Sequence, residues 1–335
     1  RNAILTERGR AVLMTFWFRR WALNASLILI AGCANAPVIP GSTGPHTGGT
    51  LSSLVRPQTK VGDLLYYTGA GQYGNETYML SFPKGELIGS FAGDGALCPD
   101  NAGNVWLAGY PNKFVSKELA EFAHGGETPI RTLDVPSVPN DCAVDPVTGN
   151  IAVVSATGKV YIYRSTSSAP QTFTTNFGAG SCTYDSSGNL FILGNRPKGL
   201  GARAEVAELP KGAKKFERRW GYRNDTGNFS GVRWDGTNIT IGTGLFMTPG
   251  VTRFWVRGKH LQAQGGLGFR GMASIGSYSI QGSKIVLTNN GGIGKFASIY
   301  MYPYPAGGRP VKKIGQKVVP GLVETSVAIS LAPRH

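Results

Sequence analysis

The stretch DNAGNVW at residues 100–106 decides the fold, because it returns as DPVTGNIA at 145–152 and as DSSGNLF at 185–191. A degenerate fourth copy, WDGTNI, occupies 234–239, so the four aspartates are 45, 40 and 50 residues apart. In each copy a short apolar strand meets a tight turn, in which Asp caps the backbone and Gly or Asn tolerates a positive φ. A second apolar strand follows, and each copy therefore predicts a β-hairpin.

A second recurring pattern follows each hairpin, and it reads as a strand, a polar or glycine-containing turn and another strand. Its six copies occupy residues 77–91, 117–133, 159–175, 204–220, 252–269 and 297–315. Four short strands in each repeat of roughly 44 residues are typical of propeller blades. Six such repeats fill residues 61–333, so the sequence predicts an all-β, six-bladed β-propeller with four antiparallel strands per blade.

The two ends of this region predict how the ring closes. Leu64 to Tyr67 matches the second strand of the other repeats, so the first repeat lacks its innermost strand. Residues 324–330, ETSVAIS, resemble the inner strands that begin near Asn140 and Gly180. We therefore expect the C-terminal strand to complete the first blade.

Composition limits the class of protein further. The 335 residues include 48 Gly and 20 Pro, and only 16% are charged, which excludes a helical bundle or coiled coil. The net charge of +15 favours anionic partners such as phospholipid headgroups or acidic polysaccharide. No run of five Lys or Arg and no nucleic-acid-binding motif accompanies the charge, so a nucleic-acid partner is not expected.

The N-terminal region reads as an export signal. Arg19 and Arg20 precede the apolar stretch 21–31, which is too short to span a bilayer. Residues 30–33, IAGC, resemble a bacterial lipobox, and this resemblance implies that Cys33 carries lipid. Residues 1–13 are predicted to be upstream non-native sequence, 14–33 the lipoprotein signal and 34–60 a flexible tether. The predicted location is the bacterial cell envelope, facing the periplasm or the cell surface, with the lipid in the membrane.

The Asp-Gly-Asn hairpins and the Gly-containing strand turns resemble six-bladed propellers of the NHL and gluconolactonase (regucalcin)-like families, over residues 61–333. The gluconolactonase-like resemblance implies a divalent cation such as Ca²⁺, with Asn140, Asp141 and Glu324 as its ligands. The corresponding positions at 180–182 and 230–232 read GSC and SGV, without Asn or Asp. A hard cation takes six to eight oxygen ligands, usually with several carboxylates, and the sequence offers at most two here. The preferred interpretation is therefore that no metal binds, that Asp141 caps a turn and that Glu324 is solvated.

Two further groups of residues are candidates for binding or structure. Loops on one face of the propeller combine aromatic, basic and amide side chains suited to glycans: Tyr73, Asn75, Tyr110, Lys113, Arg196, Lys198 and Arg203. Three cysteines, Cys98, Cys142 and Cys182, occupy nearly equivalent positions in successive inner strands. They form either one disulfide with a thiol left over or, as the preferred interpretation, three small buried side chains.

No nucleophile elbow, phosphate-binding loop or histidine cluster is present in the sequence. The sequence therefore predicts a non-catalytic module without a cofactor, which binds an envelope glycan or protein. A metal-dependent lactone hydrolase and a pure scaffold are the alternatives.

Overall fold

The computed structural model describes residues 62–71, 74–164, 169–198, 201–222, 229–244, 249–258, 260–289, 298–315, 317–319 and 323–333. The chain divides into two units, Arg1–Leu54 and Val55–His335, and every described strand lies in the second. Among the described residues, none forms a helix long and apolar enough to cross a membrane. The predicted export signal, the tether and Cys33 lie outside the described residues.

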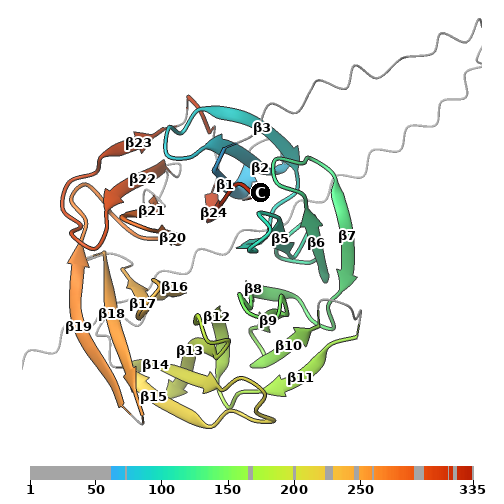
Figure 1. Cartoon of the computed structure of the whole chain (residues 1–335), viewed down its shortest axis with the longest axis vertical. Helices are drawn as coiled ribbons and strands as arrows, with labels where there is room; N and C mark the ends of the chain where they lie inside the picture. Colours follow the sequence, from blue (N-terminus) through green and yellow to red (C-terminus); the bar gives the residue numbers. More distant parts are fainter. Residues whose placement is uncertain are drawn as a thin grey trace, which may run out of the picture. The chain divides into compact units, whose positions relative to one another are not determined.

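Six four-stranded antiparallel sheets form a ring around a central axis, as predicted (Figure 1). The first three blades, from the inner to the outer strand, consist of β24 (Val323–Ser330), β1 (Leu64–Gly71), β2 (Gly74–Ser81) and β3 (Leu87–Ala92); β4 (Ala96–Pro99), β5 (Val105–Ala108), β6 (Glu118–Phe122) and β7 (Pro129–Asp134); and β8 (Pro139–Val144), β9 (Ile151–Ser155), β10 (Lys159–Tyr163) and β11 (Gln171–Thr174).

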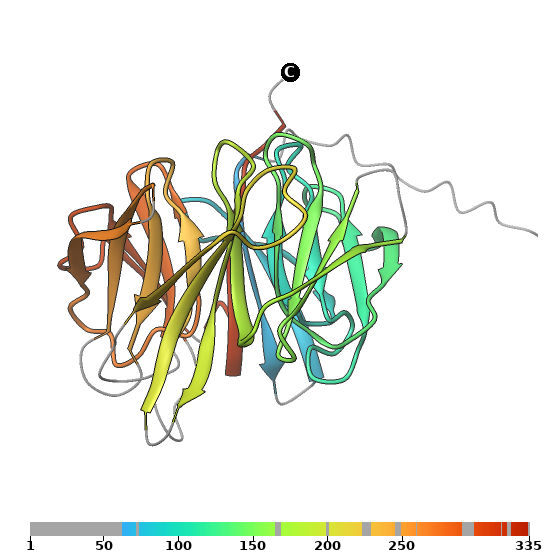
Figure 2. The same ribbon diagram turned by 90° about the horizontal axis from the view of Figure 1, so that it is seen from below.

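The other three blades follow in sequence order. They consist of β12 (Gly178–Tyr184), β13 (Leu190–Lys198), β14 (Gly201–Leu209) and β15 (Arg218–Tyr222); β16 (Phe229–Trp234), β17 (Ile239–Thr243), β18 (Gly250–Arg257) and β19 (His260–Gly268); and β20 (Tyr278–Gln281), β21 (Lys284–Asn289), β22 (Ser298–Pro303) and β23 (Lys312–Ile314). Seen edge-on, the strands run between the two faces of the ring and are joined on both (Figure 2).

The four predicted aspartate turns are confirmed, and each carboxylate accepts at least one main-chain N–H of its own turn. Asp185 Oδ1 accepts hydrogen bonds from Ser187 N and Asn189 N, both at 2.9 Å. Asp100 and Asp235 make the same kind of turn before β5 and β17. These contacts satisfy main-chain N–H groups of the turn that have no partner in a neighbouring strand.

The predicted closure of the ring is also confirmed. Strand β24 pairs antiparallel with β1, with Leu64 opposite Ser330 and Tyr67 opposite Val327. The end of β24 is held by the second blade as well, because Ser330 Oγ lies 2.8 Å from Nδ1 of His124 in the β6–β7 turn. The chain thus completes its first blade with its last strand.

The hydrophobic core lies in six layers, each between two neighbouring blades. Strand β9 shows how the sequence supplies both sides: Ile151 and Val153 pack toward the second blade, and Ala152 and Val154 toward the fourth. Successive side chains of a strand point to opposite faces, so a strand buried on both faces is a continuous apolar run.

The preferred interpretation of the cysteines is wrong for two of the three. Cys98 of β4 and Cys142 of β8 form a disulfide between neighbouring inner strands, with Cα atoms 5.8 Å apart. Cys182 is a buried free thiol, and burial raises its pKa well above the ordinary value. The disulfide joins the second and third blades covalently near the axis.

Candidate functional site

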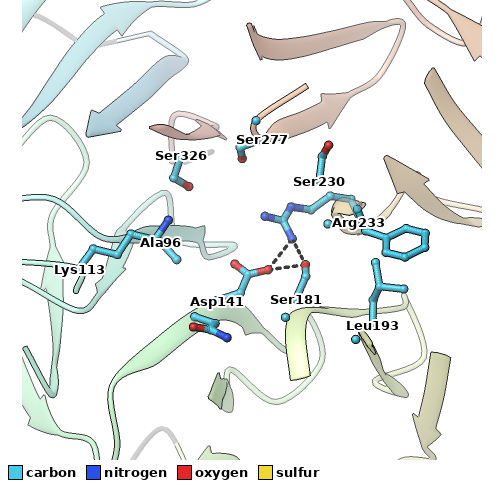
Figure 3. A pocket seen from close by; sticks show the side chains of 15 residues that line it. Ala96, Lys113, Asp141, Ser181, Leu193, Ser230, Arg233, Ser277 and Ser326 are labelled. Carbon is cyan, nitrogen blue, oxygen red and sulfur yellow. Dashed lines mark hydrogen bonds and ion pairs between the residues drawn. The ribbon is translucent and has the colours of Figure 1, made fainter. Parts of the chain in front are cut away.

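A cavity of about 200 Å³ opens where the inner strands begin, on the axis of the ring (Figure 3). Every blade contributes to its wall; one residue from each blade, in order, is Ser326, Ala96, Asp141, Ser181, Ser230 and Ser277. Strand β8 enters it at Asn140 and Asp141, at the position the sequence predicted. The wall is mostly hydroxyl, amide and charged groups rather than the apolar side chains of the blade layers.

The polar wall also holds the blades together. At four of the six junctions, a side chain of one inner strand accepts a hydrogen bond from the main-chain N–H of the next. The acceptors are Ser326, Asp141, Ser181 and Ser277, and their donors are Leu97, Cys182, Val232 and Val327 at 3.2, 3.2, 3.0 and 3.4 Å, respectively. Inner strands of neighbouring blades are not paired in one sheet, so these side chains satisfy N–H groups that would otherwise be unpaired.

A buried ion pair forms the floor of the cavity. Arg233 Nη1, from β16, lies 2.8 Å from Asp141 Oδ2, and the two side chains are only 19% and 6% exposed. Ser181 Oγ donates to the same carboxylate oxygen at 2.5 Å. Burial opposes the charge of Arg233, but the attraction of Asp141 outweighs it and raises the pKa of the guanidinium, which stays charged.

Arg233 also lines a second cavity, further along the inner strands. The second cavity, of about 170 Å³, is lined by the later residues of the inner strands, among them Cys98, Cys182 and Trp234. Arg233 contributes to the walls of both cavities.

Lys113 reaches the cavity from the loop between β5 and β6, and this loop is fixed to β2 of the first blade and to the connection between β3 and β4. Its main-chain N–H donates to Asp94 Oδ1 at 3.0 Å, and Asn75 Nδ2 donates to the Pro111 carbonyl at 3.3 Å. The Tyr110 ring packs on Phe122 with ring centroids 5.7 Å apart. In Figure 3 the Lys113 side chain extends into the cavity toward Arg233.

Of the predicted metal ligands, Asn140 and Asp141 line the cavity, and Glu324 lies in β24, with its side chain outside the described residues. The expectation that Asp141 caps a turn is wrong, because its carboxylate binds Arg233, Ser181 and the amide of Cys182. Asn140 Nδ2 donates to the Ala179 carbonyl at 3.0 Å.

The described surroundings of Asp141 disfavour a divalent cation. The carboxylate of Asp141 already has the Arg233 guanidinium 2.8 Å from its Oδ2 oxygen, and that positive charge would repel a second cation. The described residues also contain no group of three His, Cys, Asp or Glu side chains that could hold a metal ion.

The predicted binding residues fall into three groups. Lys113 lines the cavity, whereas Asn75 and Tyr110 are not in its lining and hold the Lys113 loop in place. Tyr73 lies outside the described residues. The expected loop at 195–203 is instead a continuation of β13 and β14, which pairs the Cα atoms of Arg196 and Arg203 and of Lys198 and Gly201; the side chains of these bases are not described.

Arg233 and the four serines of the cavity, Ser181, Ser230, Ser277 and Ser326, were not among the predicted site residues. The available signal was charge: the inner strands β8 and β16 contain one Asp and one Arg among otherwise uncharged residues. Charged side chains are almost never fully buried without a partner, so an acid and a base in two inner strands indicate a pair.

The fold is similar to several solved propellers. A protein of unknown function from Bacteroides caccae superposes with a TM-score of 0.55 and 10% identity, over 80% of this chain and 99% of that one. Hydrazine synthase from Kuenenia stuttgartiensis gives 0.51 and 10%, over 68% and 70%. The Cps50 (Swd1) β-propeller domain from Myceliophteria thermophila gives 0.52 and 10%, over 76% and 84%. At these identities the similarity shows the fold alone.

No protein-family model matches the chain, and no curated protein sequence matches it significantly.

Proposed function

We propose that this chain is a non-catalytic binding module of the bacterial cell envelope, which takes a small polar ligand into the cavity at the start of the inner strands. The observation that carries the proposal is that cavity: all six blades line it, and Asp141 and Arg233 close its floor. Convergent polar groups in a concave site on a rigid scaffold are what ligand recognition requires.

Binding is favoured over hydrolysis because Asp141, the only described carboxylate of the site, is already paired with Arg233. A lactone hydrolase of the gluconolactonase-like kind would use Asn140, Asp141 and Glu324 around a cation, and the Arg233 guanidinium next to Asp141 would repel that cation. The resemblance of the repeats to NHL and gluconolactonase-like propellers therefore supports the architecture more than the chemistry.

The envelope location rests on residues 14–33, with their apolar stretch, the sequence IAGC and Cys33 as the proposed lipid attachment. Partners at the membrane surface are expected to be a glycan or an envelope protein. Labelling cells with radioactive palmitate tests this part: the chain should carry label, and Cys33→Ser should not. Equal labelling of the two would contradict the anchor.

The cavity itself is tested by blocking it. Gly180 lines the cavity and has room for a side chain, because a Cβ there would meet only the Leu193 carbonyl oxygen, at 3.7 Å. Gly221, on the outer strand of the same blade, has nothing within 4 Å of its Cβ position and serves as the control.

The full chain is screened against small polar compounds by the rise in melting temperature that binding produces by mass action. A compound that stabilises the parent chain should stabilise Gly221→Trp equally and leave Gly180→Trp unchanged. If the compounds that bind stabilise both variants equally, the cavity is not the binding site.

A further inference from the structure

The guanidinium of Arg233 is only partly used by the protein. Its Nη1 donates to Asp141 Oδ2 and to the carbonyl of Val232, each at 2.8 Å, and to Ser181 Oγ at 3.0 Å. Within the described part of the chain, Nε and Nη2 have no hydrogen-bond acceptor. The cavity therefore contains the two N–H groups on one edge of a charged guanidinium, and that edge matches the two oxygens of a carboxylate.

Three more donors share this cavity. Ser277 Oγ and Ser326 Oγ each accept a main-chain N–H, so the hydroxyl proton of each remains free to be donated. Lys113 adds an ammonium group on the opposite side from Arg233, and no ion pair joins it to a described carboxylate (Figure 3).

One acceptor also belongs to the site. All three donors to Asp141 bind its Oδ2 oxygen, and Oδ1 has no partner among the described residues. Lys113 and Arg233 together with Asp141 give this set of described side chains a net charge of one positive unit. A ligand with a single negative charge would neutralise it, and a hydroxyl group on that ligand would find an acceptor in Oδ1.

We propose that the cavity binds a small organic carboxylate with a hydroxyl group next to the carboxylate. This deepens the binding function proposed above and rests on it. The carboxylate would lie between the Arg233 edge, Lys113 and the hydroxyls of Ser277 and Ser326, and the ligand hydroxyl would donate to Asp141. A volume of about 200 Å³ is below that of drug-sized pockets and suits a ligand of a few carbon atoms.

Three probes separate these contributions: lactate, propionate, which lacks only the hydroxyl, and lactamide, which lacks only the charge. Each is titrated into the full chain by calorimetry at matched ionic strength, with chloride as the reference anion. Lactate should bind, propionate should bind about tenfold more weakly, and lactamide and chloride should give no measurable heat.

A pair of lysine variants assigns the site. Lys113→Met should weaken lactate binding about tenfold or more, the loss of one charge-assisted hydrogen bond. Lys117→Met, an exposed lysine at the end of the same loop, should leave the affinity unchanged. Both substitutions are outside the hydrogen-bonded ring, so both proteins should fold.

Lactamide binding as tightly as lactate would overturn the proposal, and so would equal lactate affinity in the two lysine variants. These failures are distinct from failure of the binding function. If lactate fails these tests, but a neutral compound binds and Gly180→Trp abolishes its binding, the cavity remains a ligand site and only the carboxylate proposal is refuted.

Discussion

Replacing Arg233 with Met tests the central role of the buried ion pair. The substitution removes the guanidinium 2.8 Å from Asp141 and leaves that carboxylate, 6% exposed, without its counter-charge. Removing one partner of a buried pair costs about 3–5 kcal/mol. Asp141 keeps hydrogen bonds from Ser181 Oγ and the Cys182 amide, so we expect the lower end, about 3 kcal/mol.

The expected fall in melting temperature follows from this loss of unfolding free energy and from the number of residues in the propeller. Roughly 270 residues between Leu64 and Ser330, at about 2.1 cal/mol/K each, give an unfolding entropy near 0.6 kcal/mol/K. The melting temperature of Arg233→Met should therefore fall by about 5 °C. The exposed Arg309, changed to Met in the same way, should shift it by less than about 1 °C.

A second substitution separates loss of charge from loss of volume. Asp141→Asn in the Arg233→Met background replaces the unpaired carboxylate with a neutral amide, which should restore more than half of the lost stability. Denaturant unfolding followed by tryptophan fluorescence measures all four proteins. If the two single losses simply add in the double variant, or if Arg233→Met unfolds like the parent, the ion-pair argument is wrong.

Three other changes test the fold. Changing Cys98 and Cys142 to Ala opens a link between residues 44 apart, which should cost about 4 kcal/mol in unfolding experiments, and reductant should then affect only the parent chain. Burial opposes ionisation of Asp235, but hydrogen bonds from Tyr304, the Asn238 and Thr237 amides and Arg253 lower its pKa overall. Its stabilising effect should therefore be present above about pH 4 and lost as the pH falls further, and Asp235→Asn should flatten this acid limb of the stability curve; parallel curves would contradict the assignment. Deleting residues 322–335 should abolish cooperative thermal unfolding, and an unchanged melting curve would refute closure by β24.

The architecture could be predicted because its signals are local and repeated. Each Asp-Gly-Asn turn fixes a hairpin from within six or seven residues, and the spacing of the copies sets the number of strands per blade. Closure was predictable for the same reason, since the first repeat lacked a strand that the C-terminal segment resembled. The family resemblance added an expected metal site that the geometry does not support.

The disulfide was harder to predict than the blades, because one residue of offset within a strand decides which cysteines meet. Cys142 and Cys182 each precede their turn aspartate by three residues, but Cys98 precedes Asp100 by two. In a strand, an offset of one residue turns a side chain to the opposite face. Cys98 therefore faces the third blade and meets Cys142, whereas Cys182 meets neither.

The contacts of Arg233 and Lys113 depend on parts of the chain that are far apart in sequence. Arg233 meets Asp141 across 92 positions, and the Lys113 loop is held by Asp94, in the connection between β3 and β4. The side-chain pattern of a single strand does not predict contacts between distant blades. The only sequence signal for the ion pair was the presence of opposite charges in two inner strands.

Closure by β24 has a consequence for how the protein folds. The second to sixth blades can assemble from contiguous chain, but the inner edge of β1 has no strand to pair with until β24 has been made, more than 250 residues later. An open strand edge is a template for any chain that carries the missing strand. At high concentration the β24 of another copy competes for that edge, so refolding yield should fall with concentration as swapped oligomers replace closed rings.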